Sequence, residues 1–235
     1  NPKWTNYCLA VTLYVVNDIQ KAITMSDRPE KSPRKQQKRS LRTKQKLLDA
    51  ALDAFSESGF AGTSTRDIAA RAGVHHPLIT YHFSNKDRLW RSAVKYIFAD
   101  FIDALKAAQA ENVNACPKAR FASMIRIYIY YAASKPALHK IIFQESSNPS
   151  SRLDWLSEKF LKPLSEASSG YIAELQDKGV VRPGNPQIIY NMIRVSSGGL
   201  IALALELKST SNIDFSSDET LEELTELIIQ TFLPG

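Results

Sequence analysis

Three of the four histidines in this 235-residue chain lie within one short segment, at His75, His76 and His82. An imidazole can ligate a metal ion, or it can donate to and accept from the edges of nucleic-acid bases. Adjacent residues on a helix point about 100° apart, and no cysteine or carboxylate completes a ligand set. The spacing therefore favours hydrogen bonding over metal binding, and we expect no cofactor.

These histidines could contact DNA if Thr65–Phe83 forms a helix-turn-helix. Two closely crossing helices need a small residue, which Ala69 supplies, and a turn that takes positive φ, which Gly73 supplies. Thr65 is expected to cap the second helix, and Leu78 or Ile79 to anchor the third. The outer face of the third helix would then enter the major groove.

Phosphate contacts position such a protein, and base contacts specify the sequence. Tyr81 has the alternative role of plain packing inside the protein. The side chains expected to contact bases or phosphates are Thr65, His75, His76, Pro77, Leu78, Thr80, Tyr81, His82 and Lys86.

The positive charge is concentrated around this segment. Residues 25–91 hold 14 Lys and Arg against 7 Asp and Glu, whereas residues 92–235 carry a net charge of −2. Such asymmetry indicates a polyanion partner for the N-terminal part. Residues 26–40 lack large apolar side chains and are expected to be disordered in isolation, forming a flexible arm that contacts DNA or serves only as a solubility device. Their basic residues are Arg28, Lys31, Arg34, Lys35, Lys38 and Arg39.

Residues 1–24 stand apart from the rest. Residues 7–16 form an apolar run that is too short to span a bilayer and lacks a signal-peptide cleavage site. Met25 resembles a translation start, so we interpret residues 1–24 as an upstream extension; the alternative is an extra strand or helix packed on the body. Two distant cysteines fit a reducing cytoplasm, near the nucleoid, with no membrane association.

The remaining chain has helical periodicity and no convincing strand. We predict an all-α fold with about nine helices after Leu41, and Lys162-Pro163 should kink or break the seventh. The expected helices span residues 41–58, 65–72, 77–83, 86–112, 121–133, 136–144, 153–178, 186–208 and 218–232.

The C-terminal part offers candidates for a ligand pocket and an interface. Pockets are mostly apolar with a few placed polar groups, although aromatic residues at helical spacing also build ordinary cores. The candidate pocket residues are Phe121, Met124, Tyr128, Tyr131, Phe143, Trp155, Phe160, Tyr190 and Arg194. The last two helices could form a four-helix bundle between two copies, or pack within one chain. The candidate interface residues are Ser196, Gly199, Leu203, Leu224 and Ile228.

Residues 48–90 resemble the Tet-repressor (TetR/AcrR) family of bacterial regulators. The matching features are A-x-x-x-F-x-x-x-G-F, T-x-x-x-I-A-x-x-A-G-V, Y-H-F and N-K-D-x-L, in this order. The resemblance implies a homodimer on a pseudo-palindromic operator and a helical body that binds a small effector. It adds Arg66 to the expected DNA contacts. His75 and Thr80 depart from the residues common in the family.

We therefore expect a transcriptional regulator, most simply a repressor released by an effector. The expected parts are an extension and basic arm (1–40), a DNA-binding domain (41–88) and an effector-binding and dimerisation domain (89–235). One alternative is a constitutive DNA-binding protein without an effector. Another is a helical enzyme, which the absence of G-x-S-x-G, P-loop and dinucleotide motifs disfavours.

Overall fold

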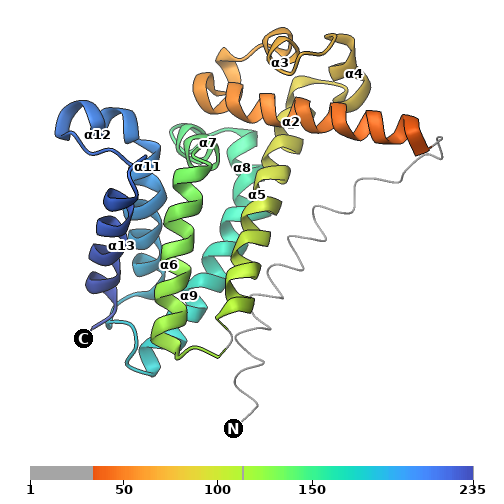
Figure 1. Cartoon of the computed structure of the whole chain (residues 1–235). Helices are drawn as coiled ribbons and strands as arrows, with labels where there is room; N and C mark the ends of the chain where they lie inside the picture. The colour runs from red at the N-terminus through yellow and green to blue at the C-terminus, as the bar shows by residue number, and fades with distance from the viewer. Residues whose placement is uncertain (1–33, 113, 235) are drawn as a thin grey trace.

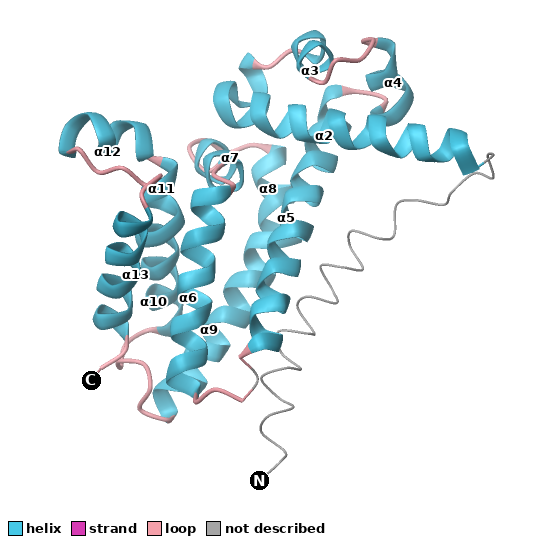
Figure 2. Cartoon of the chain, in the orientation of Figure 1, coloured by secondary structure: helices cyan, strands magenta, loops and turns pink. Residues whose placement is uncertain are grey.

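Every secondary-structure element that the structure describes is helical, so the all-α prediction is confirmed (Figures 1 and 2). The computed structural model describes residues 34–112 and 114–234. The α-helices are α2 (Arg34–Gly62), α3 (Thr65–Arg71), α4 (Pro77–Phe83), α5 (Lys86–Glu111), α6 (Pro117–Ser134), α7 (Ala137–Glu145), α8 (Ser151–Leu156), α9 (Lys162–Asp177), α10 (Pro186–Arg194), α11 (Leu200–Ala202), α12 (Ala204–Ser211) and α13 (Asp218–Phe232). Two π-helical turns, η1 (Ser157–Leu161) and η2 (Val195–Gly199), join some of them.

The helices form an upper unit and a larger bundle below it (Figure 1). The upper unit consists of α2, α3 and α4, and α5 runs from it down into the bundle. Helix α7 lies directly beneath α2, and these two helices pack together. The upper unit is therefore attached to the bundle along α5 and through α7.

Helix α2 begins earlier than the sequence suggested. The expectation of a flexible arm over residues 26–40 is wrong for Arg34–Ser40, which form the first turns of α2. Arg, Lys and Gln are good helix formers, so a helix fixed by packing from Leu47 onward can extend through them. Residues 1–33, which include Arg28 and Lys31, lie outside the described residues.

The helix-turn-helix forms as predicted, with one difference at its start. Ser64, not Thr65, is the N-cap residue of α3, and its Oγ accepts a 3.0 Å hydrogen bond from the Asp67 N–H. Thr65 is already inside the first turn. Gly73 has φ +64°, as the tight turn requires, and Ala69 is buried where the helices meet.

The upper unit and the near end of the bundle share one hydrophobic core. The inner faces of α2, α3 and α4 contribute Phe55, Ile68 and Ile79 to it. The same cluster continues into the bundle through Trp90 of α5 and Phe160 of η1. Helix α5 thus crosses the expected 88/89 boundary without an interruption in either the helix or the core.

A second core fills the far side of the bundle. Residues from α6, α9, α10 and α13 meet there, including Ile129, Ile172, Ile193 and Ile228. Apolar faces on four helices bury one another, which is how an all-helical layer architecture becomes stable.

Pro163 is accommodated by a widened turn. A proline inside a helix has no N–H and its ring clashes with the carbonyl four residues earlier, which is Lys159. The helix passes through the π turn η1 just before Pro163, where the wider winding relieves this clash. The predicted disturbance at Lys162-Pro163 is therefore present as a π turn within residues 151–177.

The single helix predicted over 186–208 is wrong. The π turn η2 interrupts it at Val195–Gly199, and at Leu203 the chain bends by 77° into α12. The run Ser196-Ser197-Gly198-Gly199 has weak helix propensity, so packing rather than periodicity sets the local backbone. Helix α12 ends at Asn212, which adopts a left-handed conformation with φ +56°.

In the described part of the chain, no single helix is both long and apolar enough to cross a membrane. Pro186–Ala202 and Ala204–Ser211 reach that length and hydropathy only when taken together across the 77° bend.

Candidate DNA-binding surface and ligand cavity

The predicted DNA-contacting residues lie together on one surface of the upper unit. Helix α4 buries Ile79 and Phe83 against the core, which leaves its other side free. His75, His76, Pro77 and Thr80 are exposed, as is Arg66 of α3, while Thr65, Leu78, His82 and Lys86 are half-buried.

Tyr81 projects from this surface. Its side chain is 76% exposed, and its ring forms an edge contact with the His82 ring, at 4.9 Å between centroids. An aromatic side chain that packed in the core would be buried, so the packing alternative for Tyr81 does not hold within this chain. The phenol is available to a partner.

His76 is held in place by the preceding helix. Its Nε2 lies 2.9 Å from the Oγ1 of Thr65, across the turn between α3 and α4. This hydrogen bond links the first turns of the two helices and uses one ring nitrogen of His76. The His76 residue as a whole is exposed.

His82 and Lys86 sit in less polar surroundings than the other members. Burial, with Lys44 nearby, lowers the pKa of His82, so the neutral imidazole is favoured. Burial, with Arg152 nearby, lowers the pKa of Lys86, whose Nζ lies 4.6 Å from the centre of the Phe60 ring. Lys86 is thus positioned by an aromatic face as well as by its charge.

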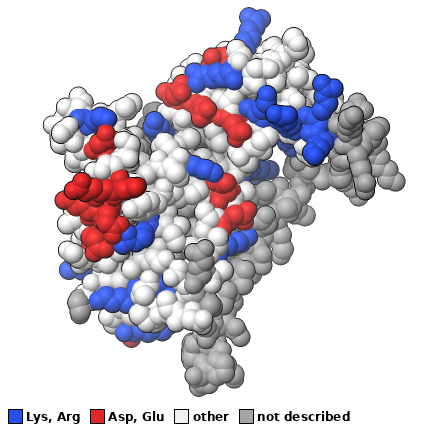
Figure 3. All heavy atoms as spheres, in the orientation of Figure 1, with Lys and Arg blue, Asp and Glu red and all other residues white. Residues whose placement is uncertain are grey.

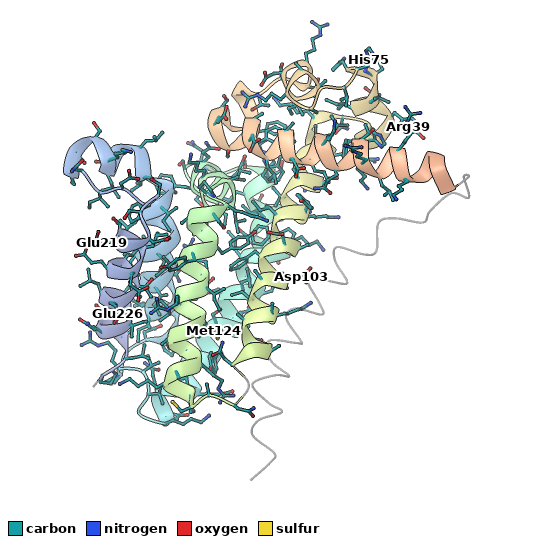
Figure 4. The ribbon with its side chains drawn as sticks, in the orientation of Figure 1. Arg39, His75, Asp103, Met124, Glu219 and Glu226 are labelled. Carbon is teal, nitrogen blue, oxygen red and sulfur yellow. The ribbon has the colours of Figure 1, made fainter. Side chains whose placement is uncertain are left out.

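Positive charge gathers on the same unit. Figure 3 shows Lys and Arg side chains clustered at the right of the upper unit, beside a row of Asp and Glu on the same unit, and a second group of Asp and Glu over α13. The described basic residues at the start of α2 include Lys38, Arg39 and Arg42. In Figure 4, Arg39 and His75 both extend from the upper unit, well away from α6 and α13. Sequence reasoning placed Arg39 in a flexible arm, whereas α2 fixes its position.

In residues 34–112 and 114–234, no group of three or more His, Cys, Asp or Glu side chains could hold a metal ion. His75, His76 and His82 occupy different directions around the start and outer side of α4.

The bundle encloses a cavity of about 160 Å³ between α5, α6, α7, α9 and α10. Five of the predicted pocket residues line it, namely Phe121, Met124, Tyr128, Tyr190 and Arg194. Met124 extends from α6 in Figure 4. Most of the remaining lining is aliphatic or aromatic and comes from these five helices and from η1.

Four predicted pocket residues lie elsewhere. The Tyr131 hydroxyl donates to Asp100 at 2.8 Å and to the Ile97 carbonyl, and Phe143 is 55% exposed on the outside of α7. Trp155 packs against Trp90, and Phe160 stacks on Phe98 at 4.2 Å. Helical spacing marks these side chains as large and apolar, but it cannot tell a filled core from a cavity.

Sequence reasoning missed His139, which also lines the cavity. Its Nε2 lies 2.8 Å from the Tyr128 hydroxyl, and burial lowers the pKa of His139 to about 4. Burial raises the pKa of Tyr128, so both groups are neutral near pH 7. Their sequence separation of 11 residues, on two different helices, gives no local signal for this pair.

A groove of about 930 Å³ runs along the outside of the bundle between α10, η2 and α13. Three of the predicted interface residues, Ser196, Leu224 and Ile228, line it; Gly199 and Leu203 do not. Its rim carries exposed apolar side chains, namely Ile188, Met192, Val195 and Leu227.

Helix α7 connects the cavity to the upper unit. The Gln144 side chain donates a 2.9 Å hydrogen bond to the Ser56 carbonyl of α2. Buried Glu145 pairs with Arg152 at 3.0 Å, and the Arg152 guanidinium lies 4.0 Å from the centre of the Phe60 ring. His139, which lines the cavity, is on the same short helix.

Residues 47–93 match the family described as bacterial regulatory proteins, tetR family. The chain is 26% identical over 196 residues to the HTH-type transcriptional regulator RutR of Escherichia coli strain K12, covering 81% of this chain and 91% of that protein. It is 56% identical over 43 residues to the HTH-type transcriptional repressor Rv3405c of Mycobacterium tuberculosis, 18% of this chain and 23% of that one. The crystal structure of HlyIIR, a hemolysin II transcriptional regulator, shares the fold, with a TM-score of 0.60, 19% identity and coverage of 83% and 99%.

Proposed function

Because the chain is a DNA-binding transcriptional regulator of the Tet-repressor family, we propose that it is a repressor, that it binds a palindromic operator as a homodimer and that a small molecule in the cavity releases it. It is a regulator and not an enzyme. The observation that carries the proposal is the exposure of one face of α4. Its inner face is buried, whereas its outer face, on which Tyr81 is 76% exposed, lies near a cluster of basic side chains.

In the proposed complex, α4 enters the major groove. His75, His76 and Thr80 would meet base edges, and Pro77 and Leu78 would contact thymine methyl groups. Tyr81, His82, Lys86, Thr65 and Arg66 would contact phosphates and set the register. The basic residues at the start of α2 would add charge that makes binding depend on salt.

The proposed dimer forms through the groove between α10, η2 and α13. Its exposed apolar rim, including Ile188 and Leu227, is the kind of surface that a second copy would cover. Binding to successive major grooves requires that the dimer hold its two α4 helices about 34–36 Å apart. We place the functional parts at 41–88 for DNA binding and 89–235 for effector binding and dimerisation.

The effector would act through the spacing of the two α4 helices. A cavity bounded by α7 is well placed for this, because α7 packs on α2, where Gln144 bonds the Ser56 carbonyl. Glu145 of α7 also pairs with Arg152 of α8, whose guanidinium lies over the Phe60 ring of α2. To invert operator occupancy from 99:1 to 1:99, the effector must prefer the released state by about 5.5 kcal/mol.

The first experiment is selection of bound duplexes from a random DNA pool, followed by measurement of affinity for the selected site. A base contact contributes about 1–3 kcal/mol, and the double variant His76→Ala, Tyr81→Ala loses one base contact and one phosphate contact, so it should bind at least about tenfold more weakly. Leu205→Ala, an exposed change on α12, is the control and should bind as the unmodified protein does. Undiminished binding by the double variant would rule out α4 as the reading helix.

A further inference from the structure

The side chains that line the cavity carry positive charge without a matching negative charge. Among its lining residues, Arg194 is the one permanently charged group, and no Asp or Glu is present. The rest of the lining is apolar apart from Gln109, Ser168, His139 and three tyrosines. The described lining therefore offers one cation and no counter-ion.

Arg194 lies at the last turn of α10 and is half-buried. Its guanidinium donates to the neutral Asn191 Oδ1, at 3.2 and 3.3 Å, and among the described residues no carboxylate forms an ion pair with it. A cation beside an apolar space is stabilised when an anion joins it. Because Arg194 is only half-buried, an anion there would keep part of its hydration, which limits the desolvation cost.

The polar groups near Arg194 supply hydrogen-bond donors and no negatively charged acceptor. Tyr190 precedes Arg194 by one helical turn, so both side chains lie on the same side of α10 and line the cavity. Burial raises the pKa of Tyr190 and of Tyr128, so both phenols keep their protons at neutral pH. Nδ1 of His139 is buried without a hydrogen-bond partner in the described chain, which leaves that ring able to bind a ligand.

The space limits the size of the ligand. The cavity of about 160 Å³ is walled by Phe98, Phe101, Phe121 and Leu138. A protein cavity of about 150 Å³ lined by Leu, Ile and Phe holds a molecule the size of benzene. The apolar body that fits is thus a single ring or a short alkyl chain.

From these features we propose that the effector is a small organic monocarboxylate whose apolar body fills the cavity and whose carboxylate is bound by Arg194, with the Tyr190 hydroxyl as a second donor. This inference rests on the proposed function, because it names the ligand of the same cavity. A carboxylate suits the site because it can accept two parallel hydrogen bonds from a guanidinium.

The first test compares acids with alcohols of the same body, by calorimetry on the intact protein. Benzoate and octanoate are measured against benzyl alcohol and octan-1-ol. A hydrogen bond to a charged group contributes enough that each acid should bind about tenfold to a hundredfold more tightly than its alcohol. Alcohols that bind as tightly as the acids, or acids that do not bind at all, would overturn the proposal, and neither result depends on a variant.

The second test removes the cation. Arg194→Gln should weaken octanoate binding at least about tenfold and leave octan-1-ol unchanged, whereas Arg194→Lys should retain part of the preference for the acid. Lys178→Gln is the matched control, since Lys178 is exposed and lies outside the cavity lining. An Arg194→Gln protein that binds octanoate like the Lys178→Gln protein would overturn the assignment of Arg194.

Measuring whether a bound ligand releases the operator DNA distinguishes failure of the carboxylate inference from failure of the proposed function on which it rests. Octanoate that binds through Arg194 but leaves the DNA complex intact would support the ligand class and contradict effector release. A neutral compound that releases the DNA while no acid binds would support the proposed function and overturn the carboxylate.

Discussion

At the scale of single residues, the Tyr128–His139 pair shows how the bundle controls protonation. The two rings lie 2.8 Å apart at the cavity wall, where burial favours the neutral form of each. Arg194 is nearby and further disfavours a charged imidazole. The cavity is thereby kept free of a second positive charge at neutral pH.

This burial makes stability depend on pH in a defined window. The pKa of His139 is 6.5 in an unfolded chain and about 4 when folded, so the unfolded state binds the extra proton between these values. The contribution is complete above about pH 6.5 and is lost as the pH falls toward 4, by about 3 kcal/mol. Urea unfolding at pH 7 and pH 4 should show that His139→Gln loses less stability than the unmodified chain.

His75→Gln is the control for that measurement, because the His75 ring is exposed on the upper unit. It should lose as much stability on acidification as the unmodified protein. An equally steep loss in the His139→Gln variant would contradict the assignment.

Another pair of residues holds α7 against its neighbours. Glu145 is 7% exposed and depends on Arg152 for its charge partner, so Arg152→Gln should leave a buried carboxylate unpaired and cost about 3 kcal/mol. The Glu145→Gln, Arg152→Gln double variant should recover most of this loss. Chemical unfolding of the three variants gives the comparison.

The exposed Lys208–Asp214 pair supplies the reference, because Lys208→Gln should cost less than about 1 kcal/mol. A double variant that is as unstable as Arg152→Gln would show that the charge pair is not what matters.

At the scale of elements, η2 and α7 meet where a side chain has no room. A Cβ at Gly198 would overlap the His139 ring, so the glycine allows α7 to approach the π turn. Gly198→Ala should therefore destabilise the chain by about 1–3 kcal/mol, by forcing the ring to move. In a chain that already carries His139→Ala, the Gly198→Ala substitution should cost less stability, because the ring that the Cβ would overlap is gone.

Gly170→Ala on α9 is the matched substitution, since a Cβ there meets nothing within 4 Å. It should be neutral or stabilising by up to about 1 kcal/mol, because alanine favours a helix. Equal effects of the two substitutions in thermal unfolding would contradict the close approach at Gly198.

The sequence predicted helix ends and turns correctly where one or two neighbouring residues determine the backbone conformation. Gly73 and Pro77 mark the turn and the start of α4, and both were identified from the sequence. The N-cap was misplaced by one residue, because Ser64 and Thr65 carry the same cap chemistry and only the backbone decides between them. The bend at Leu203 was missed because its apolar neighbours continue the helical pattern.

The cavity was only half predictable. Residue type correctly marked Tyr128 and Arg194 as pocket candidates. It marked Trp155 and Phe160 as well, because they are large and aromatic like Tyr128, but these two side chains pack in the core. His139 and the α5 residues of the lining enter through packing between helices distant in sequence. No single-helix pattern contains that information.

At the scale of the whole molecule, the basic surface and the apolar groove lie on different parts. Basic residues gather on the upper unit and acidic residues on α13, so the surface proposed for DNA and the surface proposed for the second copy are separate (Figure 3). This separation lets assembly be tested without altering α4.

Leu227 is 56% exposed on the rim of the groove, where a second copy would bury it. Leu227→Glu should place a charge in that interface, so the protein should sediment as a monomer and bind its operator far more weakly. Sedimentation velocity and operator titration measure the two effects.

Leu205→Glu on α12 is the control, as Leu205 is 80% exposed and outside the groove. It should behave as the unmodified protein. A Leu227→Glu protein that remains dimeric would place the interface elsewhere.

Helix α5 carries a consequence for how the molecule melts. It is 26 residues long, and its inner side lies in one core with α2, α3 and α4 above and with α7 and η1 below. The upper unit cannot lose that core without exposing the bundle, so the two should unfold as one cooperative transition. Any compound that occupies the cavity would then raise the melting temperature of the whole chain. A melting curve is enough to search for the ligand before any operator sequence is known.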